Sequence, residues 1–173
     1  FVLNSLYQMS QSALTTEDIN KFNQLSIQPK LLYMDALNYG SKLFGRDGDH
    51  WLIMKAVSKI KKFINAATNS GWKLKVFTDA AIKTNETMKK WQKRREAEVK
   101  SECRAIAQGM NVLLGDAFRE NGVEVLYSVE ADNDDTLAAW ASKDGAAILS
   151  GDQDFFRYRG LTCPIYCAYE IKD

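Results

Sequence analysis

The pattern of apolar and polar residues along this chain alternates between short apolar runs and longer stretches of helical character. The apolar runs typical of buried strands lie at residues 31–34, 73–78, 123–127, 146–150 and 165–168. Helical spacing of apolar residues, or a high density of charged residues, marks residues 50–69, 85–109, 111–120 and 134–143. Strands that alternate with helices predict a parallel sheet covered on both faces. We therefore expect an α/β protein, namely a three-layer α/β/α fold with a mostly parallel central sheet of about five strands.

The first 29 residues differ from the rest because they are polar and mixed, and they end at Pro29. Residues 15–18 resemble a helix start, and Ile19, Phe22 and Leu25 follow at helical spacing. We interpret residues 1–29 as a helical N-terminal arm and residues 30–173 as a single domain. Protein partners would bind through this arm or through regions outside the chain.

Composition narrows the class of protein. The apolar fraction of 46% is ordinary for a soluble globular domain, and the net charge of +1 means that a nucleic-acid surface would have to be a local patch. The longest apolar runs fall far short of the roughly 20 residues that a membrane span requires, and no signal peptide is visible. We expect an intracellular protein, cytoplasmic or nuclear, with no membrane partner.

Cysteine and histidine offer little chemistry in this chain. The cysteines are Cys103, Cys163 and Cys167, an odd number that favours a reducing compartment over a disulfide framework. Only His50 could join them as a zinc ligand, so we expect buried thiols and no zinc site. Nucleophilic catalysis with a histidine base would also depend on His50, which lies at a predicted helix start.

Acidic residues follow four of the predicted strands at the point where each strand ends. In an open α/β sheet the carboxyl ends of the strands form the edge where ligands bind, so these side chains should converge in one crevice. The acidic residues are Asp35, Asp79, Glu130, Asp132, Asp134, Asp135, Asp152 and Asp154. A single aspartate of this kind, such as Asp134, Asp135 or Asp152, would be a helix cap or turn residue. Four strand ends together favour a shared site.

Carboxylates at this density raise one another's proton affinity and need positive compensation. Hard divalent cations such as Mg²⁺ or Mn²⁺ prefer oxygen ligands, so the acidic residues predict one or two such ions as cofactors. Pairs of these ions activate a water and stabilise the leaving oxygen in phosphodiester hydrolysis. The acidic residues therefore point toward phosphodiester chemistry, of the kind that a metal-dependent nuclease performs on RNA or DNA.

Four short motifs resemble the PIN-like nuclease superfamily, in particular its flap-endonuclease/XPG branch and the 5′-nuclease domain of bacterial DNA polymerase I. Residues 33–36 (Tyr-Met-Asp-Ala) and 76–79 (Val-Phe-Thr-Asp) resemble its first two strands with their acidic ends. Residues 129–138 resemble its Glu-Ala-Asp-Asp motif, which opens a helix, and residues 150–154 its Thr/Gly-Asp-x-Asp motif. The resemblance covers about residues 30–158. The catalytic, metal-binding residues that it implies are Asp35, Asp79, Asp132, Asp134, Asp152 and Asp154.

The third motif departs from the family pattern by two extra residues, since it reads Glu-Ala-Asp-Asn-Asp-Asp. Counting from its start makes Glu130 and Asp132 the metal-facing pair. Counting back from the helix makes Asp132 and Asp134 the pair, which we favour because the helix determines which side chains point into the crevice. The helix-hairpin-helix that binds duplex DNA in the family would follow residue 158 and is not found up to Asp173. We therefore favour a single-stranded substrate.

Basic residues concentrate in the predicted helix at 85–109. The candidate nucleic-acid-binding residues are Lys89, Lys90, Lys93, Arg94 and Arg95. This segment resembles the one that touches the scissile phosphate in flap-endonuclease relatives, and Lys90 and Arg94, one turn apart, would face the crevice together. The alternative is a solvated helix stabilised by Glu86–Lys90 and Glu96–Lys100 pairs.

Several residues near these motifs have two interpretations. Trp91 could stack on a base or pack the helix. Asn38 and Tyr39 could orient a metal ligand or a phosphate, although Asn38 equally suits a turn. Residues 40–48 are expected to form a flexible loop able to meet a substrate, without a phosphate-loop pattern.

Two other functions compete with the nuclease. One is a catalytically inactive PIN-like module that serves as a protein- or RNA-binding scaffold, and the other is a regulatory domain of the receiver type. An unused cluster of like charges would cost stability, which favours activity over the scaffold. The paired Asp-x-Asp after the fourth strand disfavours the receiver.

Overall fold

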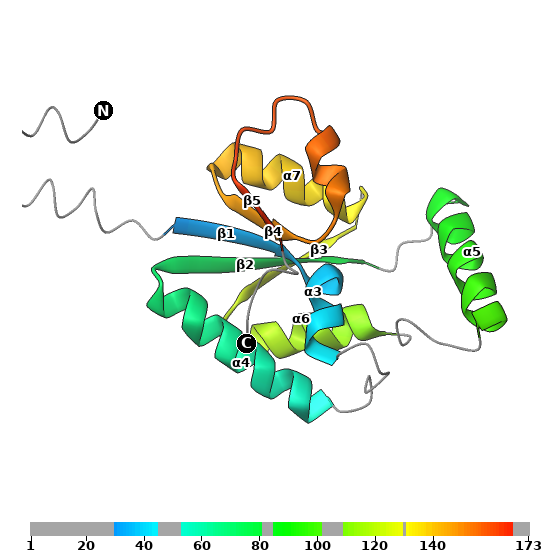
Figure 1. Ribbon diagram of the computed structural model, residues 1–173, viewed down its shortest axis with the longest axis horizontal. Coiled ribbons are helices and arrows are strands. Elements are labelled where there is room, and N and C mark those ends of the chain that lie inside the picture. Colours follow the sequence, from blue (N-terminus) through cyan, green and yellow to red (C-terminus); the bar gives the residue numbers. More distant parts are fainter. Residues whose placement is uncertain (1–29, 45–52, 81–84, 102–108, 130, 168–173) are drawn as a thin grey trace, which may run out of the picture.

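The computed structural model describes residues 30–44, 53–80, 85–101, 109–129 and 131–167 of the 173-residue chain. Within them, a parallel sheet has the strand order β3-β2-β1-β4-β5 (Figure 1). The strands are β1 (Lys30–Asp35), β2 (Trp72–Asp79), β3 (Glu124–Ser128), β4 (Ala147–Ser150) and β5 (Ile165–Cys167). Every neighbouring pair is parallel, so all the carboxyl ends lie at one edge.

Helices cover both faces of this sheet. The helices of the described residues are α3 (Ala36–Phe44), α4 (Ile53–Asn69), α5 (Asn85–Ser101), α6 (Met110–Glu120), α7 (Asn133–Asp144) and the short 3₁₀ helix η1 (Gln153–Arg157), and all except α5 cover the sheet. Helices α3, α4 and α6 pack on one face, and α7 and η1 pack on the other. The predicted three-layer α/β/α fold is therefore confirmed. No helix in the described part of the chain is long and apolar enough to cross a membrane.

Alternating side chains of the strands supply the two cores. On one face Met34 and Val76 are directly paired in register, and both are fully buried against α4 and α6. On the other face Tyr33 and Phe77 lie 5.3 Å apart between ring centroids and pack with Phe155 of η1. Because helices cover both faces, the strands read largely as apolar runs, with a few polar residues such as Lys73 and Lys75 of β2 at exposed or partly exposed positions.

The expected loop at residues 40–48 is wrong for residues 40–44, which belong to α3. Glycine at position 40 suggested a loop, but a Cβ there would lie 3.2 Å from Leu114 of α6. The glycine therefore permits a close approach of two helices. Residues 45–48 lie outside the described residues, as do the predicted arm at 1–29, His50 and Cys103.

One further boundary and the burial of the cysteines differ from the prediction. Helix α5 ends at Ser101 within the described residues, and Gly109 is not helical, because its φ of +78° places it in the left-handed region before α6. Cys163 precedes β5, and both Cys163 and Cys167 are free, half-buried thiols where buried ones were expected. Burial still raises the pKa of the Cys163 thiol.

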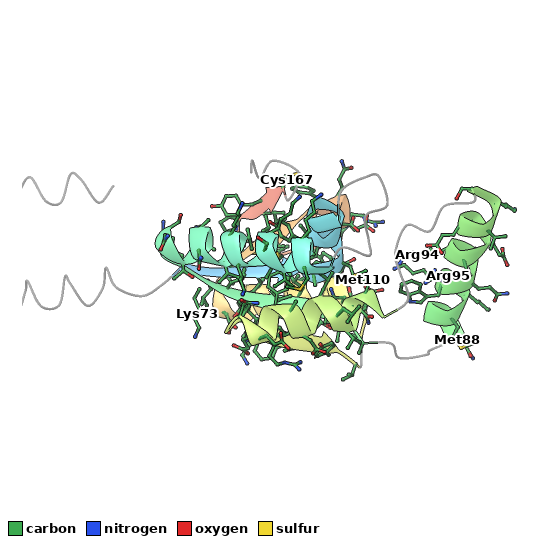
Figure 2. All side chains as sticks on the ribbon, turned by 90° about the horizontal axis from the view of Figure 1, so that it is seen from below. Lys73, Met88, Arg94, Arg95, Met110 and Cys167 are labelled. Carbon is green, nitrogen blue, oxygen red and sulfur yellow. The ribbon has the colours of Figure 1, made fainter. Side chains whose placement is uncertain are left out.

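Helix α5 lies apart from the rest of the fold, beyond the carboxyl edge of the sheet (Figure 1). Figure 2 shows Arg94 on the side of α5 that faces the sheet. This position leaves a space between the strand ends and α5, and the candidate site lies there.

Candidate functional site

A cavity of about 750 Å³ opens between the carboxyl ends of the strands and α5. The cavity is lined by aspartates from the ends of β1 and β2 and from the segments after β3 and β4. They are Asp35, Asp79, Asp132, Asp134, Asp152 and Asp154. The parallel strands bring these residues together, because residues far apart in sequence all end a strand at the same edge.

Three of the aspartates also cap the helix that follows their strand. Asp35 Oδ1 accepts hydrogen bonds from the backbone N–H groups of Leu37 at 2.9 Å and Asn38 at 3.3 Å. Asp132 and Asp152 each accept a bond from the backbone N–H two residues ahead, at 3.3 and 2.9 Å. The caps orient the carboxylates at the mouth of the cavity, so capping and a shared site are compatible. The cap of α7 is Asp132, where Asp134 or Asp135 had been considered.

Burial and like charge act together on Asp35. Its side chain is buried, and burial raises its pKa to about 6, with a smaller contribution from the charge of Asp79. Hydrogen bonds from the backbone of Asn38 and Leu37 and from the Asn38 side chain oppose that rise. Asn38 therefore holds the Asp35 carboxylate in place through its side chain and its backbone N–H. Tyr39, considered for the same role, lies in the core, 4.7 Å from the ring of Phe63.

Asp134 is the most strongly perturbed carboxylate of the cavity. Burial raises its pKa to about 7, together with repulsion from four other carboxylates. In order of effect, these neighbours are Asp35, Asp132, Asp152 and Asp79. Burial also raises the pKa of Asp79, while the charges of Lys90 and Arg94 partly oppose this. Pairs of titratable groups that raise one another's pKa in a cleft are typical of functional sites.

One residue of the lengthened third motif, Asn133, has a structural role. Asn133 is almost fully buried at the start of α7, and the hydroxyl of Ser128 donates to its Oδ1 at 2.7 Å. This contact anchors the first turn of α7 to the end of β3. Asp132 and Asp134, on either side of Asn133, both line the cavity. Glu130 lies outside the described residues.

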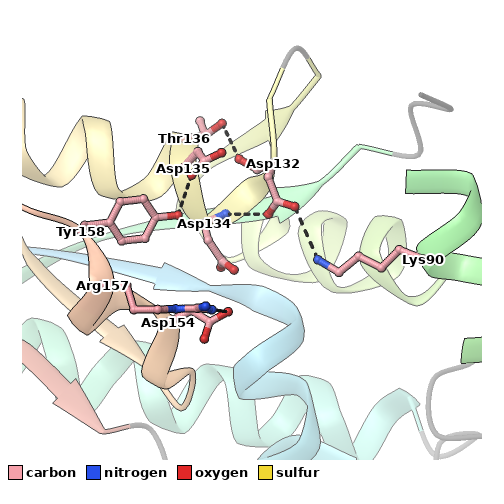
Figure 3. Close-up of polar contacts among 8 residues, drawn as sticks. All are labelled: Lys90, Asp132, Asp134, Asp135, Thr136, Asp154, Arg157 and Tyr158. Carbon is pink, nitrogen blue, oxygen red and sulfur yellow. Dashed lines mark hydrogen bonds and ion pairs between the residues drawn. The ribbon is translucent and has the colours of Figure 1, made fainter. Parts of the chain in front are cut away.

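Asp135 does not line the main cavity but contacts Tyr158, which follows η1 (Figure 3). The hydroxyl of Tyr158 donates to Asp135 at 2.6 Å, and burial together with this bond raises the pKa of Tyr158. Asp135 and Tyr158 line an adjoining recess of about 380 Å³ with Arg157, which pairs with Asp154. Sequence analysis missed Arg157 and Tyr158, because η1 is too short to show a periodic pattern.

Helix α5 forms the opposite wall of the cavity. Its lining residues recur at helical spacing and are Lys90, Trp91, Arg94, Ala97, Glu98 and Ser101. The ammonium of Lys90 lies 3.5 Å from Asp132 Oδ2, which is the contact between this wall and the acidic one (Figure 3).

The other basic residues of α5 lie elsewhere. Lys89, Lys93 and Arg95 do not line the cavity, and Arg95 pairs with Glu98 at 2.5 Å. The described residues contain no Glu96–Lys100 pair, and the Glu86 side chain lies outside them. The structure thus separates Lys90 and Arg94, which face the carboxylates, from the rest of the basic segment.

Among the described residues that line the cavity, seven carboxylates, including Glu98, outnumber the two cations, Lys90 and Arg94. All-oxygen donors of this kind suit Mg²⁺ or Mn²⁺. In the part of the chain that the structure describes, no three His, Cys, Asp or Glu side chains converge closely enough to hold one ion as they stand. The chemistry of the donors fits a hard divalent cation, while their spacing would have to adjust to bind one.

The three-layer α/β/α fold of this chain also occurs in other solved structures. Two solved structures of the catalytic core of Rad2 in complex with DNA substrate share it, each with a TM-score of 0.55. They are 16% and 14% identical to this chain, and each match covers 86% of it. The chain spans 46% and 47% of those proteins, somewhat less than half their length. No family model matches the chain, and no curated protein matches its sequence. The resemblance to PIN-like proteins is therefore confirmed at the level of the fold.

Proposed function

We propose that this protein is a metal-dependent nuclease that hydrolyses phosphodiester bonds, with single-stranded RNA or DNA as its preferred substrate. One observation carries the proposal: six aspartates from four strand ends share a cavity whose other wall presents Lys90 and Arg94. The fold shared with the catalytic core of Rad2, which was solved with DNA, supports the same function.

The acidic wall is suited to one or two Mg²⁺ or Mn²⁺ ions. The residues that would hold them, directly or through water, are Asp35, Asp79, Asp132, Asp134, Asp152 and Asp154. When bound, such ions activate a water for attack and stabilise the leaving oxygen. Raised pKa values at Asp35 and Asp134 mean that the cavity disfavours its own negative charge, and a divalent cation would relieve that cost.

Each wall has a separate task in this proposal. The helix caps hold Asp35, Asp132 and Asp152 in fixed orientations at the strand ends. Lys90 and Arg94 would hold the phosphate group across the cavity and offset the charge that develops on it. Contacts of this kind supply affinity and register but read no sequence, so we expect little sequence preference.

The test is cleavage of labelled single-stranded RNA and DNA with Mn²⁺ and with chelator. Wild-type protein should cleave only with metal, and Asp134→Asn and Asp152→Asn should each lower the rate by at least about 100-fold. Asp116→Asn is the matched control, because Asp116 pairs with Arg119 on the surface of α6, outside the cavity. It should leave the rate unchanged.

Measurements of binding and of melting temperature on the same protein distinguish the nuclease from a catalytically inactive binding scaffold. Folded protein that binds nucleic acid without cleaving it, and whose melting temperature does not rise with metal, would be a binding scaffold. Absence of both binding and cleavage would refute the nuclease proposal altogether.

A further inference from the structure

Trp91 is the single aromatic residue among the described residues that line the main cavity. Its ring is partly exposed on α5, the helix that lies apart from the sheet (Figure 1). The other two tryptophans in the described part of the chain, Trp72 and Trp140, pack against the two cores, whereas Trp91 belongs to neither. Core packing therefore does not explain a tryptophan at this position.

The contacts of Trp91 are those of a ring that binds flat, cationic groups. The guanidinium carbon of Arg94 lies 5.3 Å from its ring centroid, and that of Arg95 lies 5.8 Å away. These are cation–π distances. Arg95 is also held by Glu98, whereas Arg94 lines the cavity and faces the carboxylates.

We propose that Trp91 is a stacking platform for one unpaired nucleobase, next to the phosphate that Lys90 and Arg94 hold. The inference rests on the proposed function and specifies its substrate class. When Arg94 moves to a phosphate, the part of the ring that it covers becomes available to a base. Aromatic side chains stack with any base, because every base has a π-face, so the platform adds affinity without sequence preference.

This arrangement selects single strands. A base inside a duplex is already paired and stacked, and bringing it to Trp91 would require unstacking it first. An unpaired base can reach the ring at no such cost. The platform is therefore the physical reason to expect a single-stranded substrate.

The test compares two short single-stranded oligonucleotides of equal length, one normal and one with abasic sites throughout. Binding is measured by fluorescence anisotropy in chelator, so that nothing is cleaved. Trp91→Leu should weaken binding of the normal strand by about 5- to 150-fold, the range for loss of one stacked base. Trp91→Phe should weaken it less. Neither variant should change the affinity for the abasic strand, which keeps its phosphates.

Salt dependence provides a second readout. Trp91→Leu removes no charge, so the slope of log affinity against log salt should stay as in wild type, while Lys90→Ala should flatten that slope for both strands. Leucine and phenylalanine are both compatible with a helix, and circular dichroism checks folding. Three results would overturn the stacking platform. They are an equal loss of affinity for the normal and abasic strands, no loss of affinity for either strand, and unfolding of both variants.

The two proposals can fail separately. If wild-type protein binds and cleaves nucleic acid while Trp91→Leu binds both strands normally, only the stacking platform is wrong. If wild-type protein neither binds nor cleaves, the nuclease function is wrong, and the platform with it.

Discussion

Replacement of Asp134 by asparagine should stabilise the metal-free protein, and more strongly at alkaline than at acidic pH. The carboxylate lies among four others, and its pKa rises from 3.8 to about 7 through burial and their repulsion. A carboxyl group whose pKa is raised in the folded state favours folding when it is protonated. The favourable contribution of this carboxyl group to the free energy of unfolding is therefore fully present below about pH 4 and is lost as the pH rises through about 7. Asparagine removes the charge and keeps the shape.

The size of the effect follows from linkage. A rise in pKa from 3.8 to about 7 corresponds to about 4 kcal/mol of lost stability at pH 8 and about 2 kcal/mol at pH 5. Asp134 is only partly buried, so solvent screening should reduce these to about 2 and about 1 kcal/mol. Asp134 also lies in the first turn of α7, where its charge favours the helix by less than about 1 kcal/mol.

Urea unfolding followed by circular dichroism, in chelator at pH 5 and pH 8, measures this difference. Asp134→Asn should unfold at higher urea than wild type at pH 8, and its advantage should shrink by about 1 kcal/mol at pH 5. The control Asp116→Asn breaks a half-exposed surface pair and should change stability by less than about 1 kcal/mol at both. A destabilised Asp134→Asn at pH 8, or an equal effect at both pH values, would refute the repulsion argument.

Three further predictions concern metal, the basic wall and η1. Mn²⁺ at about 100 times its Kd should stabilise wild type by about 2.7 kcal/mol in a thermal melt, and Asp152→Asn should lose most of that gain; no shift with wild type would count against the metal. Lys90→Ala combined with Arg94→Ala should weaken binding of single strands and flatten the salt slope by about 1.4, and an unchanged slope would mean a merely solvated helix. Phe155→Ala should destabilise the fold by about 3–5 kcal/mol in urea, because Phe155 of η1 is fully buried against the sheet and α7, and a change below about 1 kcal/mol would contradict that packing.

The fold could be predicted closely because its signals are local. Buried parallel strands read as continuous apolar runs, and all five predicted strands occur within a residue or two of their expected positions. Where the loop at residues 40–48 was wrongly predicted, the cause lay in a contact between distant segments. Gly40 suggested a loop, yet its missing side chain allows α3 to approach Leu114 of α6, a residue more than 70 positions away.

The candidate site could likewise be predicted only in part from the sequence. The sequence by itself determined which carboxylates end a strand, and in a parallel sheet every strand end reaches the same edge, so Asp35, Asp79 and Asp152 could be expected to meet. Only the tertiary structure decided what each one faces. The pairing of Lys90 with Asp132 and of Tyr158 with Asp135 joins residues 42 and 23 positions apart, on elements whose relative positions depend on packing. The raised pKa of Asp134 likewise arises from burial and from charges at four strand ends, because burial and electrostatic interaction depend on position in space and not on distance along the chain.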